Sequence, residues 1–188
     1  MSEPASSPYV SRGGRKLAAA LDGFDVDVGG RVCADLGSHV GGFVDCLLQA
    51  GAAKVYSVDT AYGLLAWKLR KDPRVVVVER TNAMHVTLAE PVAIVTVDVG
   101  WTPQSRILPN VADLLAPGGR VITLIKPQYE ADAHQRKGGV VPDSAVEEVI
   151  ARTLDELRAS GWEVLGSMPS PIRGHGGNRE QLALLARS

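Results

Sequence analysis

The sequence predicts an α/β fold with a doubly wound, mostly parallel seven-stranded sheet flanked by helices. Three observations lead to this prediction. From Arg31 onward, apolar runs of strand length alternate with segments of helical periodicity. The strand-like runs carry apolar residues on both faces, as expected for parallel strands that helices cover on both sides. At 188 residues, the chain has the length of about one domain with a full hydrophobic core.

Seven runs have the length and composition of strands, and five segments have helical periodicity. The expected strands are residues 31–36, 54–59, 74–79, 92–98, 119–126, 162–168 and 181–187. The expected helices are Gly13–Leu21, Gly42–Ala50, Tyr62–Arg70, Pro103–Leu115 and Asp143–Ser160. Asp143 or Ser144 is suited to cap the last helix at its start, and Gly161 is suited to end it. The polar segment 131–142 is expected to form a surface loop.

Composition limits the partners and the compartment. The formal net charge of −1 gives no global attraction to nucleic acid or anionic lipid, so a polyanion would need a local basic patch. Cys33 and Cys46 lie among apolar residues, which favours buried free thiols over a disulfide. No apolar run approaches the ~18 residues of a membrane span, and the first residues lack the order of a signal peptide. We therefore expect a cytoplasmic protein with no membrane partner, in which residues 1–8 form a flexible tail and residues 9–188 one domain.

The first expected strand leads into a glycine-rich turn, ADLGSHVGGF. Asp35 ends the strand, Gly37 permits a tight turn through Ser38, and Gly41 and Gly42 allow close backbone approach at the start of the next helix. In a doubly wound sheet, this turn binds a nucleotide-like ligand. An acid in place of the first glycine of the dinucleotide fingerprint would repel a pyrophosphate but would pair with an ammonium group. The turn therefore favours S-adenosylmethionine over NAD as the cofactor.

Polar residues also follow the second and third expected strands. Asp59 can accept hydrogen bonds from both ribose hydroxyls of an adenosyl group, and Asn82 is placed to reach the adenine edge. A glycine-rich turn alone is weak evidence, and Asp35 alone could be a helix cap. An acid, a second acid and an amide after three consecutive strands form a more specific pattern. With Asp98 beside them, these residues are the predicted cofactor contacts.

Four charged residues near strand ends or turns suggest the methyl acceptor: Lys16, Asp98, Lys126 and Glu180. Exocyclic base amines require an Asn/Asp-Pro-Pro-aromatic turn after the fourth strand, which is missing, and both cysteines lie away from that turn. A Lys-Asp-Lys-Glu tetrad methylates a ribose 2′-hydroxyl. This hydroxyl is a poor nucleophile, so a group must take its proton while its oxygen lines up with the sulfonium methyl. The reaction requires no metal, and the sequence suggests no metal site.

Each of these four residues also has a simpler interpretation. Lys126 could extend to solvent from a strand end, and Asp98 could be an ordinary turn acid. Glu180 could be a surface residue of the last hairpin, and Lys16 a charge on a helix face. Their joint placement at strand ends or beside glycine turns favours a functional role. The sequence leaves open whether Lys126 removes the hydroxyl proton or orients the hydroxyl.

At these residues the chain resembles the TlyA (haemolysin A) group of FtsJ-like ribosomal-RNA 2′-O-ribose methyltransferases. The matching stretches include SRGGRKL, DLGSHVGGF, KPQYE, KGGVVPD and GHGGNRE, in order from Tyr9 to Glu180. The resemblance implies a Rossmann-like class I S-adenosylmethionine-dependent methyltransferase fold and the 2′-O-methylation of ribosomal or other structured RNA. It assigns the tetrad to Lys16, Asp98, Lys126 and Glu180, and cofactor contacts to Asp35, Gly37, Gly41, Asp59 and Asn82.

The chain also departs from the family pattern. The usual S-T-G-G turn reads S-H-V-G-G, the usual D-V-S-F-I-S-L reads D-V-G-W-T-P-Q, and the usual N-A-R reads N-A-M. Trp101 could still stack on a base. Only about eight residues precede Tyr9, so we expect no N-terminal S4-type RNA-binding module, and a separate RNA-binding partner would replace it. A non-catalytic protein that binds S-adenosylmethionine, RNA or the ribosome is the alternative to an enzyme.

Basic residues recur in three places around the tetrad. They are Arg12, Arg15 and Lys16 near the start, Arg136 and Lys137 in the expected loop, and Arg173, His175 and Arg179 near Glu180. If these residues converge, they could hold RNA phosphates. Scattered, solvated charges explain them nearly as well.

Overall fold

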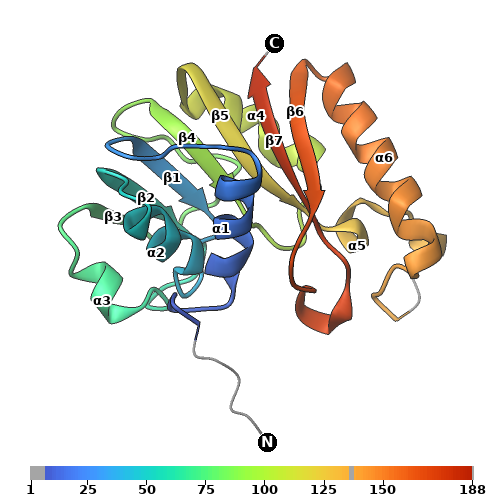
Figure 1. Cartoon of the computed structure of the whole chain (residues 1–188), viewed down its shortest axis with the longest axis horizontal. Coiled ribbons are helices and arrows are strands. Elements are labelled where there is room, and N and C mark those ends of the chain that lie inside the picture. The colour runs from blue at the N-terminus through green and yellow to red at the C-terminus, as the bar shows by residue number, and fades with distance from the viewer. Residues whose placement is uncertain (1–6, 136–137, 188) are drawn as a thin grey trace, which may run out of the picture.

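The computed structural model describes residues 7–135 and 138–187, which form a seven-stranded sheet with helices on both faces (Figure 1). The strand order is β3-β2-β1-β4-β5-β7-β6. The five strands from β3 to β5 are parallel, and β7 is antiparallel to both β5 and β6. The strands are β1 (Val32–Leu36), β2 (Lys54–Val58), β3 (Val75–Val78), β4 (Val92–Val97), β5 (Leu115–Ile125), β6 (Trp162–Pro169) and β7 (Gln181–Arg187). This sheet confirms the predicted fold class.

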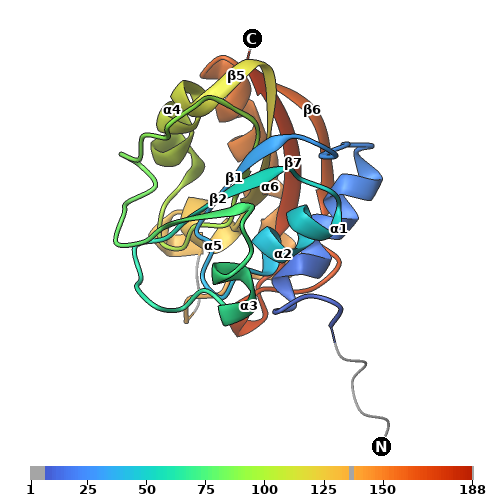
Figure 2. The same ribbon diagram turned by 90° about the vertical axis from the view of Figure 1, so that its left-hand side faces the viewer.

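Two layers of helices cover the sheet (Figure 2). Helices α1 and α2 pack on one face, and α4 and α6 pack on the other. Strand residues alternate between the two cores, as the pleat requires: Ile122 and Leu124 join the first core, while Val121 and Ile125 join the second. The helices are α1 (Gly13–Gly23), α2 (Gly42–Gln49), α3 (Trp67–Arg70), α4 (Gln104–Leu114), α5 (Pro127–Glu130) and α6 (Asp143–Ala159), and two 3₁₀ turns span Ala133–Gln135 and His175–Gly177.

Two local predictions were wrong. The helix expected from Tyr62 begins only at Trp67, because Gly63 has a φ of +75° and its N–H donates to Glu79 instead of entering a helix. Helix α6 is preceded by Pro142 at its N-cap, and neither of the two expected side chains caps it. Gly161 does follow α6 with a φ of +86°, as predicted for the residue that ends this helix.

The sheet topology brings distant residues to one edge. In register, Leu36 of β1 lies beside Val58 of β2 and Val97 of β4, so the residues that follow these strands emerge at the same level. Strand β7 runs in the opposite direction, and its first residue, Gln181, pairs with Ile125 at the end of β5. An antiparallel β7 therefore places Glu180 next to Lys126, at the edge where the parallel strands end.

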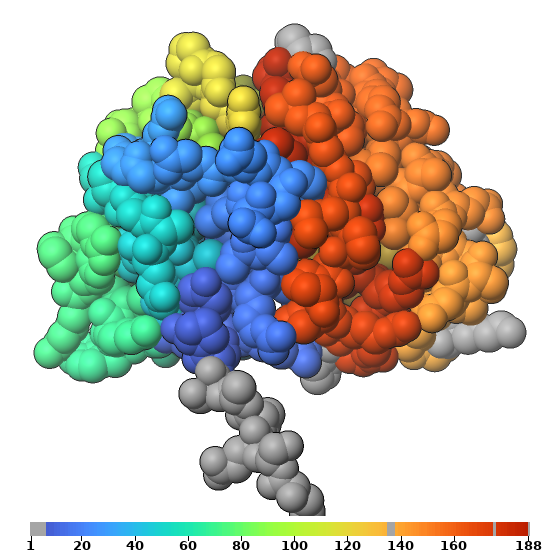
Figure 3. All heavy atoms as spheres, viewed as in Figure 1, coloured from blue at the N-terminus to red at the C-terminus, as the bar shows by residue number. Residues whose placement is uncertain are grey.

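The loop between β6 and β7 lies beside the start of α1. Figure 3 shows the blue N-terminal segment next to the orange and red β6–β7 segment at the lower front of the molecule. Elsewhere, Cys33 and Cys46 are buried free thiols as predicted, and burial raises their pKa values to about 12 and about 11. Among the described residues, no helix is long and apolar enough to cross a membrane. Arg136 and Lys137 lie outside the described residues.

Candidate active site

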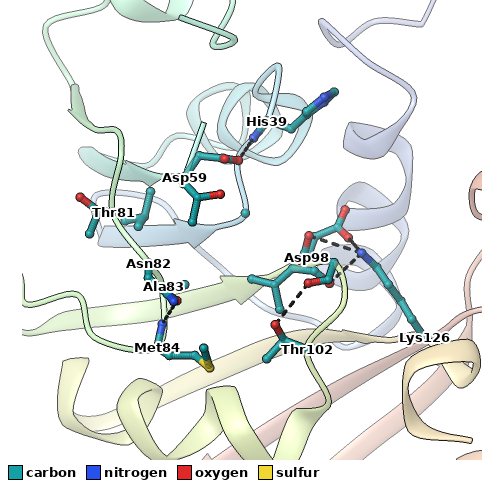
Figure 4. Close-up of a pocket in the computed structure, with 14 residues that line it drawn as sticks. His39, Asp59, Thr81, Asn82, Ala83, Met84, Asp98, Thr102 and Lys126 are labelled. Atoms are coloured by element: carbon teal, nitrogen blue, oxygen red, sulfur yellow. Dashed lines mark hydrogen bonds and ion pairs between the residues drawn. The ribbon is translucent and has the colours of Figure 1, made fainter. Parts of the chain in front are cut away.

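Lys126 reaches from the end of β5 to the end of β4. Its Nζ lies 2.6 Å from Oδ1 of Asp98 and donates to the backbone carbonyls of Val99, at 2.9 Å, and Asp98, at 3.4 Å (Figure 4). The Lys126 side chain is only 13% exposed. A carboxylate and two carbonyls together match the three donors of an ammonium group, which offsets the cost of its partial burial. Pro127 then starts the short helix α5 and turns the chain away from the sheet.

Lys16 and Glu180 form a second and deeper ion pair. Nζ of Lys16 in α1 lies 2.5 Å from Oε2 of Glu180, just before β7, and the two side chains are 9% and 3% exposed. Gly174 makes room for this pair, because a Cβ added there would collide with the Glu180 carboxylate. The pair therefore joins the first helix to the last loop of the chain.

Both ion pairs line one cavity of about 870 Å³. Its wall also includes Arg12, Trp101, Gln128, Tyr129 and Asn178. The structure thus brings together all four residues of the predicted tetrad, although they come from four segments far apart in the sequence. Their catalytic roles remain predictions.

A second cavity, of about 440 Å³, adjoins the first and shares Asp98 and Lys126 with it. Asp59 and Asn82 line it, as Figure 4 shows. The Asp59 carboxylate accepts the backbone N–H groups of His39, at 2.7 Å, and of Ala61, at 2.8 Å. These two hydrogen bonds fix its orientation. Oδ1 of Asn82 accepts the N–H two residues later, at 2.9 Å. Both predicted adenosyl contacts are therefore held in place at the cavity wall by backbone groups.

Asp35 is the most deeply buried acid at this edge. Its Oδ1 accepts the hydroxyl of Thr96 at 2.7 Å, whereas its Oδ2 has no hydrogen-bond partner within residues 7–135 and 138–187. Burial raises the pKa of Asp35 to about 7; the Thr96 hydrogen bond opposes this shift and the nearby charge of Asp98 adds to it. The side chain lines a recess of about 70 Å³ that Asp98 also lines. A buried acceptor without a partner fits a cationic ligand group better than an anionic one.

The glycines of the β1–α2 turn allow close packing. Gly37 has a φ of +89°, and a Cβ added there would lie 2.7 Å from the carbonyl oxygen of Asp98, so this glycine brings the turn against the end of β4. Gly41 makes room for leucine side chains around α3, and Gly42 makes room for Ser11. The Ser38 hydroxyl donates to the Asp35 carbonyl at 2.9 Å, so it stabilises the turn from within.

Three contributors to the site were missed in the sequence. Thr96 orients Asp35, Gly174 accommodates Glu180, and the carbonyl of Val99 accepts from Lys126. Thr96 had a visible signal, since it is the one hydroxyl in the apolar run VAIVTV. Gly174 belongs to a glycine-rich stretch, but nothing local indicates which side chain it faces. The carbonyl had no signal, because its position depends on the turn after β4.

Among the described residues, no group of three His, Cys, Asp or Glu side chains is arranged to hold a metal ion. Of the basic residues near the site, Arg179 pairs with Glu147 at 2.6 Å, away from the tetrad. Arg12, Arg15 and Arg173 line one hollow beside the tetrad cavity.

The fold matches that of solved methyltransferase structures. The structure resembles an S-adenosylmethionine-dependent methyltransferase from Mesorhizobium loti with a TM-score of 0.65 at 17% sequence identity, over 89% of this chain and 96% of that chain. An identity this low establishes the fold alone. The fold is that of the class I S-adenosylmethionine-dependent methyltransferases.

Sequence comparison then identifies the family: residues 9–187 match the FtsJ-like methyltransferase model, and the chain belongs to this family. It is 44% identical to YqxC of Bacillus subtilis, which carries the name of an rRNA methyltransferase, over 93% of this chain and 64% of YqxC. It is 41% identical to the 16S/23S rRNA (cytidine-2′-O)-methyltransferase TlyA of Mycobacterium tuberculosis, over 92% of this chain and 66% of TlyA. The solved structure of a hemolysin-like protein from Streptococcus thermophilus matches with a TM-score of 0.94 at 37% identity, over 99% of this chain and 70% of that chain. The chain thus spans about two thirds of the length of these two curated relatives.

Proposed function

We propose that this chain is an S-adenosylmethionine-dependent methyltransferase of ribose 2′-hydroxyls in ribosomal or other structured RNA. The observation that carries the proposal is the convergence of the two lysine–carboxylate pairs on one cavity, beside a recess with an unpartnered carboxylate oxygen. The name of the TlyA relative, which specifies a cytidine 2′-O-methyltransferase of 16S and 23S rRNA, supports this reaction.

The second cavity and the recess fit S-adenosylmethionine. Oδ2 of Asp35 would accept from the amino group of the methionine part, Asp59 would accept from the ribose hydroxyls, and Asn82 would meet the adenine edge. When bound, S-adenosylmethionine supplies a methyl group on a positively charged sulfur. Gly37 lets the β1–α2 turn pack directly against the end of β4, because a side chain at this position would collide with the Asp98 carbonyl.

Lys126 would orient the ribose hydroxyl. Its ammonium already donates to Asp98 and to two carbonyls, so an incoming hydroxyl oxygen would share a donor with them. Because the Lys126 ammonium is already fully protonated, the Asp98 carboxylate of this pair would take the hydroxyl proton while the oxygen accepts the methyl group that S-adenosylmethionine would supply, with its sulfur as the leaving group. Lys16 adds a second cation near the developing charge, and Glu180 fixes its position.

An aromatic pair lies at the mouth of the cavity. The Trp101 side chain is 87% exposed, and its ring centroid lies 5.2 Å from that of Tyr129. This exposed ring supports the proposal that a base of the substrate stacks on Trp101. We further propose that the reaction takes place in the cytoplasm on a ribosomal subunit, and that a separate RNA-binding partner assists this domain.

The test is methyl transfer from labelled S-adenosylmethionine to ribosomal subunits. We expect Lys126→Ala to lower the rate by about 10²–10⁴-fold, because it removes the cation that holds both the hydroxyl and the Asp98 carboxylate in place. Lys54→Ala, which removes a partly exposed lysine paired with Glu90, serves as the control and should retain the wild-type rate. Equal labelling by Lys126→Ala and wild type would contradict the role of Lys126. Calorimetric binding of S-adenosylmethionine without transfer to any RNA would favour a non-catalytic protein.

A further inference from the structure

We propose that Arg12, Arg15 and Arg173 form a binding site for a backbone phosphate of the RNA strand next to the methylated ribose. The three arginines line a hollow of about 600 Å³, whose remaining wall consists of Ile172 and glycines of the β6–β7 loop. Arg12 and Arg15 come from the start of α1, whereas Arg173 comes from the far end of the chain. The inference rests on the proposed function, since it names where the substrate strand runs beyond the reacting nucleotide.

The positive charge in this hollow exceeds the nearby negative charge. Arg12 and Arg15 are exposed, and neither has a carboxylate within ion-pair distance in the part of the chain that the structure describes. Arg173 pairs with Asp143 at 3.0 Å, but both side chains are more than half exposed, so solvent screens this pair. Planar guanidinium groups match the oxygens of a phosphate better than an ammonium group does.

Arg12, at the N-cap of α1, and Arg15, in its first turn, add positive charge to the positive end of the helix dipole. The helix has no acidic residue in its first turn, and its amide dipoles already make that end positive. Lys16 in the same turn is neutralised by Glu180, at 2.5 Å, but no described carboxylate neutralises the two arginines. Acids gather at the other end of α1 instead, where Asp22 and Asp25 line a separate hollow. This arrangement opposes the helix dipole and is compensated when an anion occupies the arginine hollow.

The hollow continues from the tetrad cavity. Arg12 and Gly176 line both, so an RNA strand that left the tetrad cavity along this surface would meet Arg12. In Figure 3, the blue start of the chain and the red β6–β7 segment form this part of the surface together. The hollow is open to solvent at Gly177, where a Cβ added to the backbone would meet nothing within 4 Å. An open, basic and continuous surface fits a flexible phosphodiester chain better than an enclosed small-molecule anion.

The experiment measures the affinity of a fluorescein-labelled single-stranded RNA by anisotropy over a series of KCl concentrations. The variants are Arg12→Ala/Arg15→Ala and Arg173→Ala, and Arg31→Ala is the matched control. Arg31 is also exposed and has no ion pair among the described residues, but it precedes β1 at the opposite edge of the sheet. The double variant is expected to bind at least tenfold more weakly. The slope of log K against log[KCl] should be less steep by about 0.7 for each phosphate that the variant no longer neutralises. Arg31→Ala should bind within about twofold of wild type, and the double variant should not melt at a lower temperature than wild type.

The outcomes separate this inference from the proposed function. Wild-type affinity and salt dependence in both arginine variants would overturn the phosphate site, even if the protein methylates RNA. Weaker RNA binding by these variants, in a protein that transfers no methyl group to RNA, would support the site and reject the proposed function. A wild-type protein that binds no RNA at all would overturn both. In the methyl-transfer assay, the arginine variants should raise KM for RNA, whereas Arg31→Ala should keep the wild-type KM.

Discussion

The two lysine–carboxylate pairs of the site have the same chemistry but different surroundings. The Lys16–Glu180 pair is almost completely enclosed, and it joins two segments from opposite ends of the chain. The Lys126–Asp98 pair is more open, with 24% of the Asp98 side chain exposed, and Lys126 has two carbonyl acceptors in addition to the carboxylate. The enclosed pair is therefore suited to hold the site together, and the open pair is suited to meet the substrate.

Asp35 extends this comparison to a third acid. It is more deeply buried than Glu180, but no lysine or arginine approaches it within ion-pair distance among the described residues. Two acids at this edge thus have a cation from the protein, whereas Asp35 remains without one. The difference is explained if a ligand supplies the third cation.

The largest expected difference is in stability. Glu180→Gln should lower the free energy of unfolding by about 3–5 kcal/mol, because it leaves the buried Lys16 ammonium without its counter-charge. Asp98→Asn should cost only about 1 kcal/mol, since the ammonium of Lys126 keeps two carbonyl acceptors and lies closer to solvent. Chemical denaturation of both variants measures the two free energies. Equal losses would show that the enclosed pair has no special structural role.

The double variant Lys16→Met/Glu180→Leu separates the structural role of the enclosed pair from its role in methyl transfer. Apolar side chains of similar volume can replace a buried ion pair at little cost. We expect the double variant to recover most of the stability lost in Glu180→Gln but none of the methyl transfer. Recovery of transfer would mean that this pair is structural only.

A smaller effect is expected at Gly174. An added Cβ would displace the Glu180 carboxylate, so Gly174→Ala should cost about 1–3 kcal/mol of the free energy of unfolding through overpacking. Gly100→Ala is the matched control, because a Cβ there meets nothing within 4 Å, and it should change stability by less than about 0.5 kcal/mol. The same denaturation assay compares them. A Gly174→Ala variant as stable as wild type would contradict the fit between this glycine and Glu180.

The smallest effect concerns the protonation of Asp35. Its pKa of about 7 means that the carboxyl is largely protonated below that pH, when it cannot pair with a cationic amine. The affinity for S-adenosylmethionine should therefore fall by about tenfold per pH unit below pH 7 and level off above it, which titration calorimetry from pH 5.5 to 8 measures. Asp35→Asn should bind weakly and lose this pH dependence. A wild-type affinity independent of pH would contradict the pairing.

The raised pKa of Asp35 also makes the stability of the free protein depend on pH. The pKa of Asp35 is raised on folding, so its favourable contribution is complete below the pKa of the unfolded chain, near 4, and is lost as the pH rises through about 7. Asp35→Asn should therefore stabilise the free protein at pH 8 relative to wild type, even though we expect it to bind S-adenosylmethionine more weakly. A variant that loses both stability and binding would indicate a structural role for the carboxylate.

Periodicity determined most of the fold in advance. The seven apolar runs became seven strands of one sheet, and the inner strands β1 and β4 are buried between helices on both faces, as their apolar composition predicts. Prediction failed where local propensity was outweighed by specific contacts. Residues 62–66 have a helical pattern, but the Gly63 N–H binds Glu79 and the chain stays irregular there. The start of α6 differs because Asp143 pairs with Arg173 instead of capping the helix.

Residue types and strand ends can be read along the chain, so they were enough to predict the fold class, the family and the four charged residues of the predicted tetrad. Which lysine meets which acid depends on how distant segments pack. The antiparallel course of β7 places Glu180 beside the end of β5, yet Glu180 pairs with Lys16 of α1, and Lys126 pairs with Asp98. These pairings depend on strand order, on the room that Gly174 leaves and on backbone carbonyls at the turn after β4. Such features arise from packing between segments up to 164 residues apart, which no local pattern encodes.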